Sequence, residues 1–184
     1  MTIGFDLDRV FINTPPLVPG SVISKLYKKK DNGVLLYRIP SRPEQVFRRV
    51  THLPLFRPPI EENLQFLRSI ANKGNKLYLI SSWYKFLEGA TNQLVKRHGL
   101  DKLFDKLYFN YENKQPHIFK NELLKELTLD VYVDDDLSLI QHVAKDNPHT
   151  KFFWLITDEH NAREHNKTLE KNVNPISELS NILI

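Results

Sequence analysis

Two groups of aspartates stand directly after short apolar runs of the chain. The first group, Asp6 and Asp8, follows the run at 3–5, and the second, Asp134, Asp135 and Asp136, follows the run at 131–133. Two ionised carboxylates about 4 Å apart repel by roughly 4 kcal/mol at an effective dielectric near 20, so a site that gathers several of them holds a cation or shares protons. Oxygen ligands favour Mg²⁺, which also accepts phosphate oxygens. The pattern therefore indicates a catalytic metal site.

A purely structural interpretation of the same aspartates is open. Asp6 and Asp8 would then be turn residues after an edge strand, and the second group would cap a helix that begins near Leu137, a role that Asp fills well. The two groups occur together, however, with further polar residues between them in the chain. This combination favours the metal site.

The polar residues between the two groups complete a known pattern. The run at 76–80 ends in Ser81, and Ser82 follows. The sequence resembles the haloacid dehalogenase-like (HAD) superfamily, dominated by Mg²⁺-dependent phosphatases, whose first motif is an apolar strand ending in Asp-x-Asp-x-Val/Thr. Here that motif reads Asp6-Leu7-Asp8-Arg9-Val10. The family's second motif, a strand ending in Ser or Thr, matches Ser81, and its fourth, a strand ending in an Asp pair, matches Asp134 and Asp135.

The family's third motif is a lysine near the start of a helix, and two lysines compete for it. If residues 117–127 are helical, Lys120 lies one turn before Leu124 on the inward face, near the helix start. Its ammonium would then point toward the carboxyl ends of the strands. Lys114 precedes Pro116 in an expected loop and is the second choice. In the structural alternative, Lys120 only packs its stem and keeps its charge in water.

The resemblance implies a role for each of these residues. Asp6 would be a carboxylate nucleophile that forms an aspartyl-phosphate, and Asp8 would be the general acid and base. An acid at the Asp8 position separates the family's phosphatases from its dehalogenases. Mg²⁺ would be held by Asp6, the Asp8 backbone carbonyl and Asp134, with Asp135 as a further ligand or as a group that orients metal-bound water. The remaining expected site residues are the catalytic Ser81 and Lys120 and the substrate-binding Ser82, Arg9 and Trp83; Trp83 could instead be a core residue.

Strand-like and helix-like segments alternate along the chain. The expected strands, rich in apolar and aromatic residues, are 2–6, 76–81, 106–109, 130–134 and 151–156. This alternation predicts an α/β fold, a Rossmann-like parallel sheet sandwiched by helices, with ligands at the carboxyl ends of the strands. The core is expected to comprise residues 1–12 and 59–184.

Residues 13–58 interrupt this core and have no counterpart in the family motifs. We expect a small cap that consists of a β-hairpin, with strands at 21–30 and 34–39 and its turn at 31–33, and a short helix that is opened by the capping box Ser41–Glu44 and runs to about Val50. From 13 to 57 there are nine basic and two acidic residues, a net charge of +7, whereas the whole chain carries +4, so the remainder carries −3. Such a cap would attract polyanions, either phosphate esters or nucleic acid ends. Alternatively, Lys28, Lys29 and Lys30 merely solvate a hairpin tip.

Composition bounds the function further. The 184 residues are 41% hydrophobic, enough for a full core, and contain no cysteine, which excludes disulfides and thiol chemistry. Because a strand begins almost at the N-terminus and no apolar run is as long as a membrane span, we expect a cytoplasmic protein. The favoured function is a Mg²⁺-dependent phosphatase of a phosphorylated small molecule or nucleotide. The alternatives are a nucleic-acid binding or end-processing protein and a catalytically silent module; the oligomeric state stays open.

Overall fold

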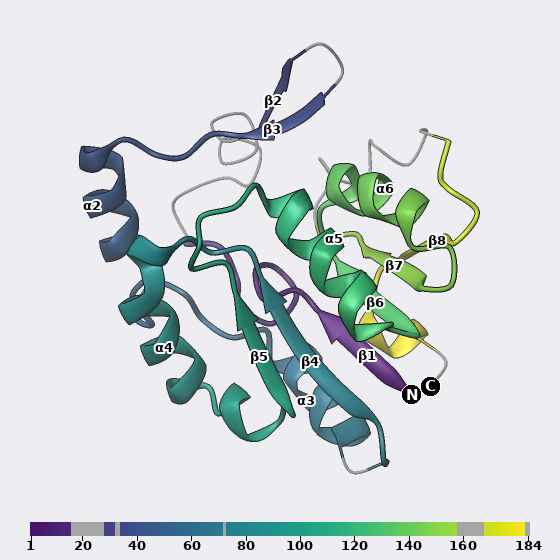
Figure 1. The fold of residues 1–184 in the computed structure, drawn as a ribbon. Coiled ribbons are helices and arrows are strands. Elements are labelled where there is room, and N and C mark those ends of the chain that lie inside the picture. The colour runs from purple at the N-terminus through teal and green to yellow at the C-terminus, as the bar shows by residue number, and fades with distance from the viewer. Residues whose placement is uncertain (16–27, 32–33, 72, 158–167, 183–184) are drawn as a thin grey trace.

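A six-stranded parallel sheet forms the centre of the structure (Figure 1). The structure is a computed structural model that describes residues 1–15, 28–31, 34–71, 73–157 and 168–182. In spatial order the strands are β5 (Lys106–Phe109), β4 (Lys76–Ser81), β1 (Thr2–Phe5), β6 (Val131–Asp134), β7 (Lys151–Leu155) and β8 (Val173–Ile176). This architecture confirms the predicted fold class.

Helices cover both faces of the sheet. One face packs against α3 (Glu61–Ala71), α4 (Glu88–Arg97) and the 3₁₀ turns η2 (Leu100–Lys102) and η4 (Leu179–Asn181), and the other packs against α5 (Pro116–Leu127) and α6 (Leu137–Asp146). Because side chains alternate along a strand, each strand contributes to both cores: in β6, Val133 joins the first cluster and Tyr132 the second. Among the residues that the structure describes, no helix combines the length and apolarity needed to cross a bilayer.

Helices α5 and α6 follow strands β5 and β6 in the chain, so their N-terminal ends lie beside the carboxyl ends of the strands, and both helices begin at residues suited to that role. The Asp136 side chain accepts hydrogen bonds from the backbone N–H of Ser138 at 3.1 Å and of Leu139 at 3.2 Å, and so caps α6. Pro116 occupies the first turn of α5, where its missing N–H costs nothing. The positive ends of both helix dipoles therefore lie toward the carboxyl ends of the strands.

Among the described residues of 13–58, three elements lie outside the central sheet. Strands β2 (Lys28–Asp31) and β3 (Val34–Tyr37) form an antiparallel hairpin, and α2 (Arg42–Thr51) follows with the predicted capping box, in which Glu44 accepts from the Ser41 N–H at 2.7 Å. The expected earlier part of the hairpin, 21–27, lies outside the described residues. The two ends of the insertion lie side by side: the Asn13 N–H donates to the Pro58 carbonyl at 2.8 Å.

Candidate active site

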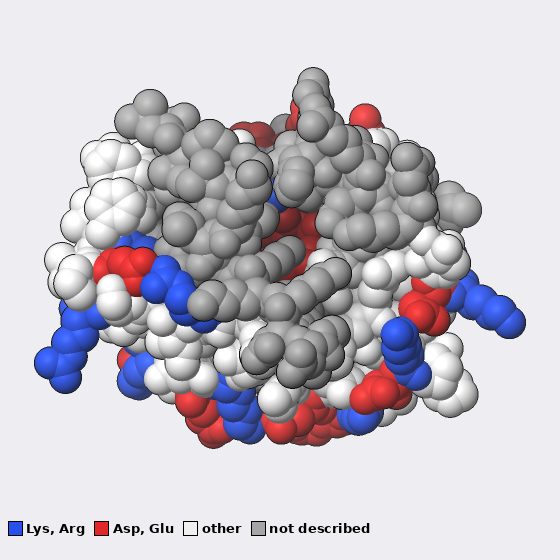
Figure 2. All heavy atoms as spheres, turned by 90° about the horizontal axis from the view of Figure 1, so that it is seen from above, with Lys and Arg blue, Asp and Glu red and all other residues white. Residues whose placement is uncertain are grey.

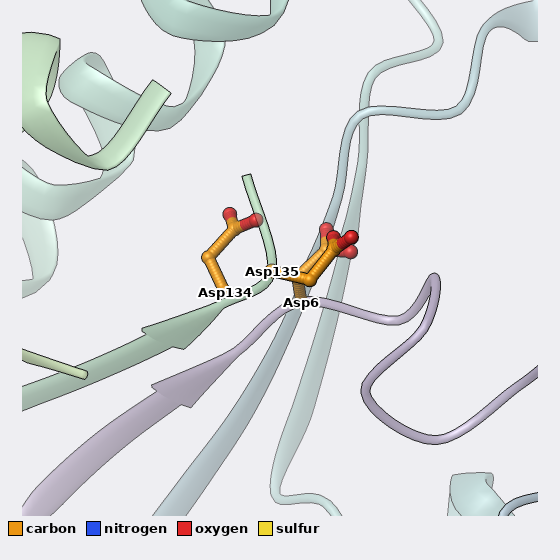
Figure 3. Close-up of side chains that lie close together, drawn as sticks. All are labelled: Asp6, Asp134 and Asp135. Atoms are coloured by element: carbon orange, nitrogen blue, oxygen red, sulfur yellow. The ribbon is translucent and has the colours of Figure 1, made fainter. Parts of the chain in front are cut away.

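Three carboxylates meet where β1 and β6 end. Asp6, Asp134 and Asp135 each offer one oxygen, and these oxygens lie within 4.8 Å of one another (Figure 3). They converge because β1 pairs with β6 and the first residue after β1, Asp6, donates its N–H to the Val133 carbonyl at 2.9 Å. Viewed from above the strand ends, acidic side chains are visible at the centre of this face (Figure 2). The two sequence groups thus form one acidic cluster, defined here as Asp6, Asp134 and Asp135.

Lys120 lies inside the acidic cluster. Its side chain reaches from α5, is almost fully buried, and donates to Asp6 Oδ1 at 2.7 Å and to Asp134 Oδ2 at 2.6 Å. Burial alone would lower the pKa of this ammonium, but Asp134 and Asp6 raise it well above its ordinary value, so Lys120 is charged at neutral pH. Lys114, the competing lysine, is exposed and pairs with Glu112 and Glu122 away from the cluster.

The second aspartate group divides into separate tasks. Asp134 is buried and accepts from the Tyr132 hydroxyl at 3.0 Å and from the Asp136 N–H at 2.9 Å. Asp135 faces Arg9, whose Nη1 lies 3.2 Å from Asp135 Oδ2. Asp136 caps α6 and also accepts from the Tyr37 hydroxyl at 2.8 Å. The helix-capping role that the structural interpretation gave to all three aspartates therefore fits Asp136, whereas Asp134 and Asp135 belong to the acidic cluster.

Asp8 lies beside the cluster and is held by two side chains. Its N–H donates to Asp6 Oδ2 at 2.8 Å, its Oδ2 accepts from Trp83 Nε1 at 2.8 Å, and its Oδ1 forms an ion pair with Arg57. Trp83 therefore contacts the expected general acid as well as the core. Sequence reasoning missed Arg57, because it is one of five arginines in the insertion and no local pattern distinguishes it.

Two hydroxyls at the end of β4 have no hydrogen-bond partner among the described residues. They belong to Ser81, which is almost fully buried, and to Ser82, which is half-buried. A buried hydroxyl without a partner costs free energy, so such groups are usually satisfied by a ligand or water. Strand pairing between β4 and β1 brings Ser81 to the edge of the sheet that holds the acidic cluster.

The acidic cluster fits a divalent cation. Its three carboxylates face two cationic side chains, Lys120 and Arg9, which leaves a net charge of −1 if all are ionised. Burial raises the pKa of Asp6 and of Asp135, and the contacts with Lys120 and Arg9 offset only part of this effect. A hard cation would favour the ionised carboxylates, and the donor set consists of oxygens alone, as Mg²⁺ prefers. The residues present therefore suit the ion that the sequence predicts.

Comparisons with known proteins support the same fold. No protein-family model and no curated protein sequence matches the chain. Among solved structures, it is similar to a D,D-heptose 1,7-bisphosphate phosphatase of B. bronchiseptica complexed with magnesium and phosphate, with a TM-score of 0.58, 10% identity and coverage of 97% of this chain and 93% of that one. A HAD family enzyme of Bacteroides thetaiotaomicron, in complex with magnesium and inorganic phosphate, has a TM-score of 0.54, 16% identity and coverage of 86% and 95%.

The chain has the HAD-like fold. This confirms the resemblance that the motifs indicate, at the level of architecture, since identities this low show the fold alone. A third similar structure, the Pnkp1/Rnl/Hen1 RNA repair complex, has a TM-score of 0.51 and 15% identity; 84% of this chain is covered but only 42% of that one. The acidic cluster lies at the carboxyl edge of the HAD-like sheet, the edge at which open α/β sheets bind ligands.

Proposed function

We propose that the chain is a Mg²⁺-dependent phosphohydrolase that acts on a phosphate monoester through an aspartyl-phosphate at Asp6. The observation that carries the proposal is the buried Lys120, which bridges Asp6 and Asp134 at 2.7 and 2.6 Å within a cluster of three carboxylates. A lysine buried between two carboxylates brings positive charge to the point where a phosphoryl group would meet Asp6. The unpartnered Ser81 hydroxyl adds a donor at the same sheet edge.

In the first step, a carboxylate oxygen of Asp6 attacks phosphorus while the bond between phosphorus and the leaving oxygen breaks. Asp8 donates a proton to that leaving oxygen, which then departs as an alcohol. The Lys120 ammonium and the Ser81 hydroxyl donate to the phosphoryl oxygens and stabilise their charge. Mg²⁺ held by Asp6, the Asp8 backbone carbonyl and Asp134, with Asp135 as a further ligand, supplies additional charge neutralisation when bound.

In the second step, water attacks the phosphorus of the aspartyl-phosphate. Asp8, now a carboxylate, accepts a proton from this water, and the bond between phosphorus and the Asp6 oxygen breaks. Inorganic phosphate leaves, and Asp6 returns as a carboxylate. Because Asp8 gives a proton in one step and takes one in the next, its position relative to Asp6 affects both.

A second candidate substrate is the phosphorylated end of a nucleic acid. The observation in its favour is the charge of residues 13–57, +7 in a chain of +4, because such a segment attracts polyanions. One of the similar structures is part of an RNA repair complex. Hydrolysis of oligonucleotides that carry a terminal phosphate, weakened by added salt, would favour this substrate over a metabolite.

The proposal is tested with p-nitrophenyl phosphate in Mg²⁺ and in EDTA. The wild type should turn it over only with Mg²⁺, and Asp6→Asn should abolish turnover, because an amide oxygen cannot form the phosphoenzyme. The matched control is Asp101→Asn, which changes an exposed aspartate away from the cluster and should keep full activity. Wild-type turnover in Asp6→Asn would contradict the proposal.

A further inference from the structure

Arg57 is a buried charge at the junction between the insertion and the core. Only 2% of its surface is exposed, and its guanidinium lies 5.3 Å from the centre of the Trp83 ring. Burial lowers its pKa to about 10, with Asp6 opposing the shift, so the side chain is still cationic at neutral pH. A buried cation is costly unless it is paired, and the partner that the structure gives it is Asp8.

Arg57 and Trp83 together hold both oxygens of the Asp8 carboxylate. The guanidinium pairs with Oδ1, and the Trp83 indole N–H donates to Oδ2 at 2.8 Å. The ion pair thus lies at one oxygen of Asp8 and the indole hydrogen bond at the other, so the two side chains fix the orientation of the carboxylate. The side chain of Asp8 is itself about one-third exposed, and without these two donors water would compete for it.

The backbone around Arg57 is fixed to the core. The next residue, Pro58, accepts from the Asn13 N–H at 2.8 Å, and Ile60 donates to the Phe11 carbonyl at 2.8 Å. The guanidinium thus extends from a rigid base, as a side chain that orients another needs.

We infer that Arg57 is the positioning residue for Asp8 in the proposed reaction, so that the insertion contributes to proton transfer. This inference rests on the proposed function. Arg57 acts through Asp8: it fixes the direction of the Asp8 carboxylate toward the leaving oxygen, and Trp83 supports it. A displacement of about 1 Å in a catalytic group can lower the rate by about 100-fold, so loss of the contact between Arg57 and Asp8 should lower the rate measurably.

The inference predicts a dependence on the leaving group. p-Nitrophenol leaves readily without a proton, whereas phenol, a weaker acid, needs one. Arg57→Gln should therefore lower kcat/KM for phenyl phosphate by about 100-fold and for p-nitrophenyl phosphate by less than about 10-fold. Trp83→Phe, which keeps an aromatic side chain but loses the indole N–H, should change the ratio in the same direction. Adding Arg57→Gln to Asp8→Asn should produce no further loss.

A second readout does not depend on activity. The chain has two tryptophans, and the Trp83 indole N–H donates to Asp8, whereas that of Trp154 donates to the Asp135 carbonyl at 3.2 Å. In Arg57→Gln, hydrogen exchange of the Trp83 indole measured by NMR should accelerate several-fold, while that of Trp154 stays unchanged as the internal control. Arg49→Gln, an exposed arginine of the same insertion, should alter neither the exchange nor the leaving-group ratio.

The possible outcomes separate the inference from the proposed function. Equal losses on the two esters, or unchanged Trp83 exchange in Arg57→Gln, would overturn the positioning role. Exchange that accelerates equally at Trp83 and Trp154 would indicate a general loosening of the fold and would also overturn it. A wild type that hydrolyses neither ester in Mg²⁺ would overturn the proposed function, whereas the exchange experiment still decides whether Arg57 holds Asp8.

Discussion

Replacing Lys120 by Met tests how the acidic cluster is held together. Methionine keeps most of the length and apolar stem of the side chain but removes the ammonium that contacts Asp6 at 2.7 Å and Asp134 at 2.6 Å. With Lys120 and Arg9 both present, the three ionised carboxylates of the cluster leave a net charge of −1, and the variant leaves −2. Removing one partner of a buried ion pair typically costs about 3–5 kcal/mol, so a loss of this size is expected in the free energy of unfolding at pH 8 without Mg²⁺.

The loss should depend on pH in a defined direction. Burial already raises the pKa of Asp6 and Asp135, and without Lys120 the pKa of Asp6 should rise further. A carboxyl with a raised folded pKa binds its proton more tightly in the folded state, so it destabilises the fold as pH rises through that pKa. The deficit of Lys120→Met should therefore be largest near pH 8 and shrink toward pH 5, where protons neutralise the cluster.

The assay is urea denaturation followed by circular dichroism at pH 5 and pH 8, in EDTA and in Mg²⁺. Mg²⁺ should stabilise the variant more than the wild type, because Lys120 no longer competes for the same oxygens. Lys114→Met is the matched control, since this lysine pairs with the exposed Glu112 and Glu122, and should leave stability nearly unchanged. A loss below about 1 kcal/mol at pH 8, or one that grows toward pH 5, would refute the reasoning.

Three further predictions concern residues outside the acidic cluster. Burial lowers the pKa of His52 to about 3, so between pH 6.5 and pH 3 the unfolded chain binds a proton at this residue and the folded chain does not. The free energy of unfolding should therefore fall as pH drops through this window, by at most about 1.4 kcal/mol per pH unit. His52→Phe should reduce this dependence of stability on pH, as measured by urea titrations. Asp136→Ala removes the α6 cap and should lower the unfolding free energy by about 1–2 kcal/mol; an unchanged urea midpoint would contradict this. Replacing Lys28, Lys29 and Lys30 by Glu should raise KM for a polyanionic substrate at low salt and leave kcat nearly unchanged. An unaltered KM would indicate that these lysines only solvate the hairpin.

Much of the fold and the gathering of the acidic cluster could be predicted from sequence, because they follow from local patterns. Apolar runs that alternate with helical segments predict the strands of a parallel sheet, and the carboxyl ends of such strands lie at one edge. Because β1 pairs with β6, Asp6 and Asp134 lie near each other at that edge. Lys120 could be preferred over Lys114 because helical periodicity places it in line with Leu124, a buried residue.

What the sequence could not predict depends on contacts between distant segments or on exceptions to local rules. Strand β8 includes Asn174 and Pro175, which are unusual in strands; an edge position tolerates them, but edge position is a property of the assembled sheet. The pairing of Arg57 with Asp8 joins the last arginine of the insertion to a core residue that precedes the insertion. Arg9 adopts φ of 59°, a left-handed conformation that is rare for residues other than glycine and that no local pattern indicates here.

The most direct test of the central claim is to identify the phosphorylated group during turnover. The wild type is mixed with p-nitrophenyl phosphate in Mg²⁺, quenched in acid within one turnover, digested, and examined by mass spectrometry. The account predicts one phosphoryl group on the peptide that contains Asp6, absent in EDTA and absent in Asp6→Asn. Product release with no phosphoryl group on Asp6 at any time before the first turnover is complete, or a phosphoryl group on another residue, would contradict it.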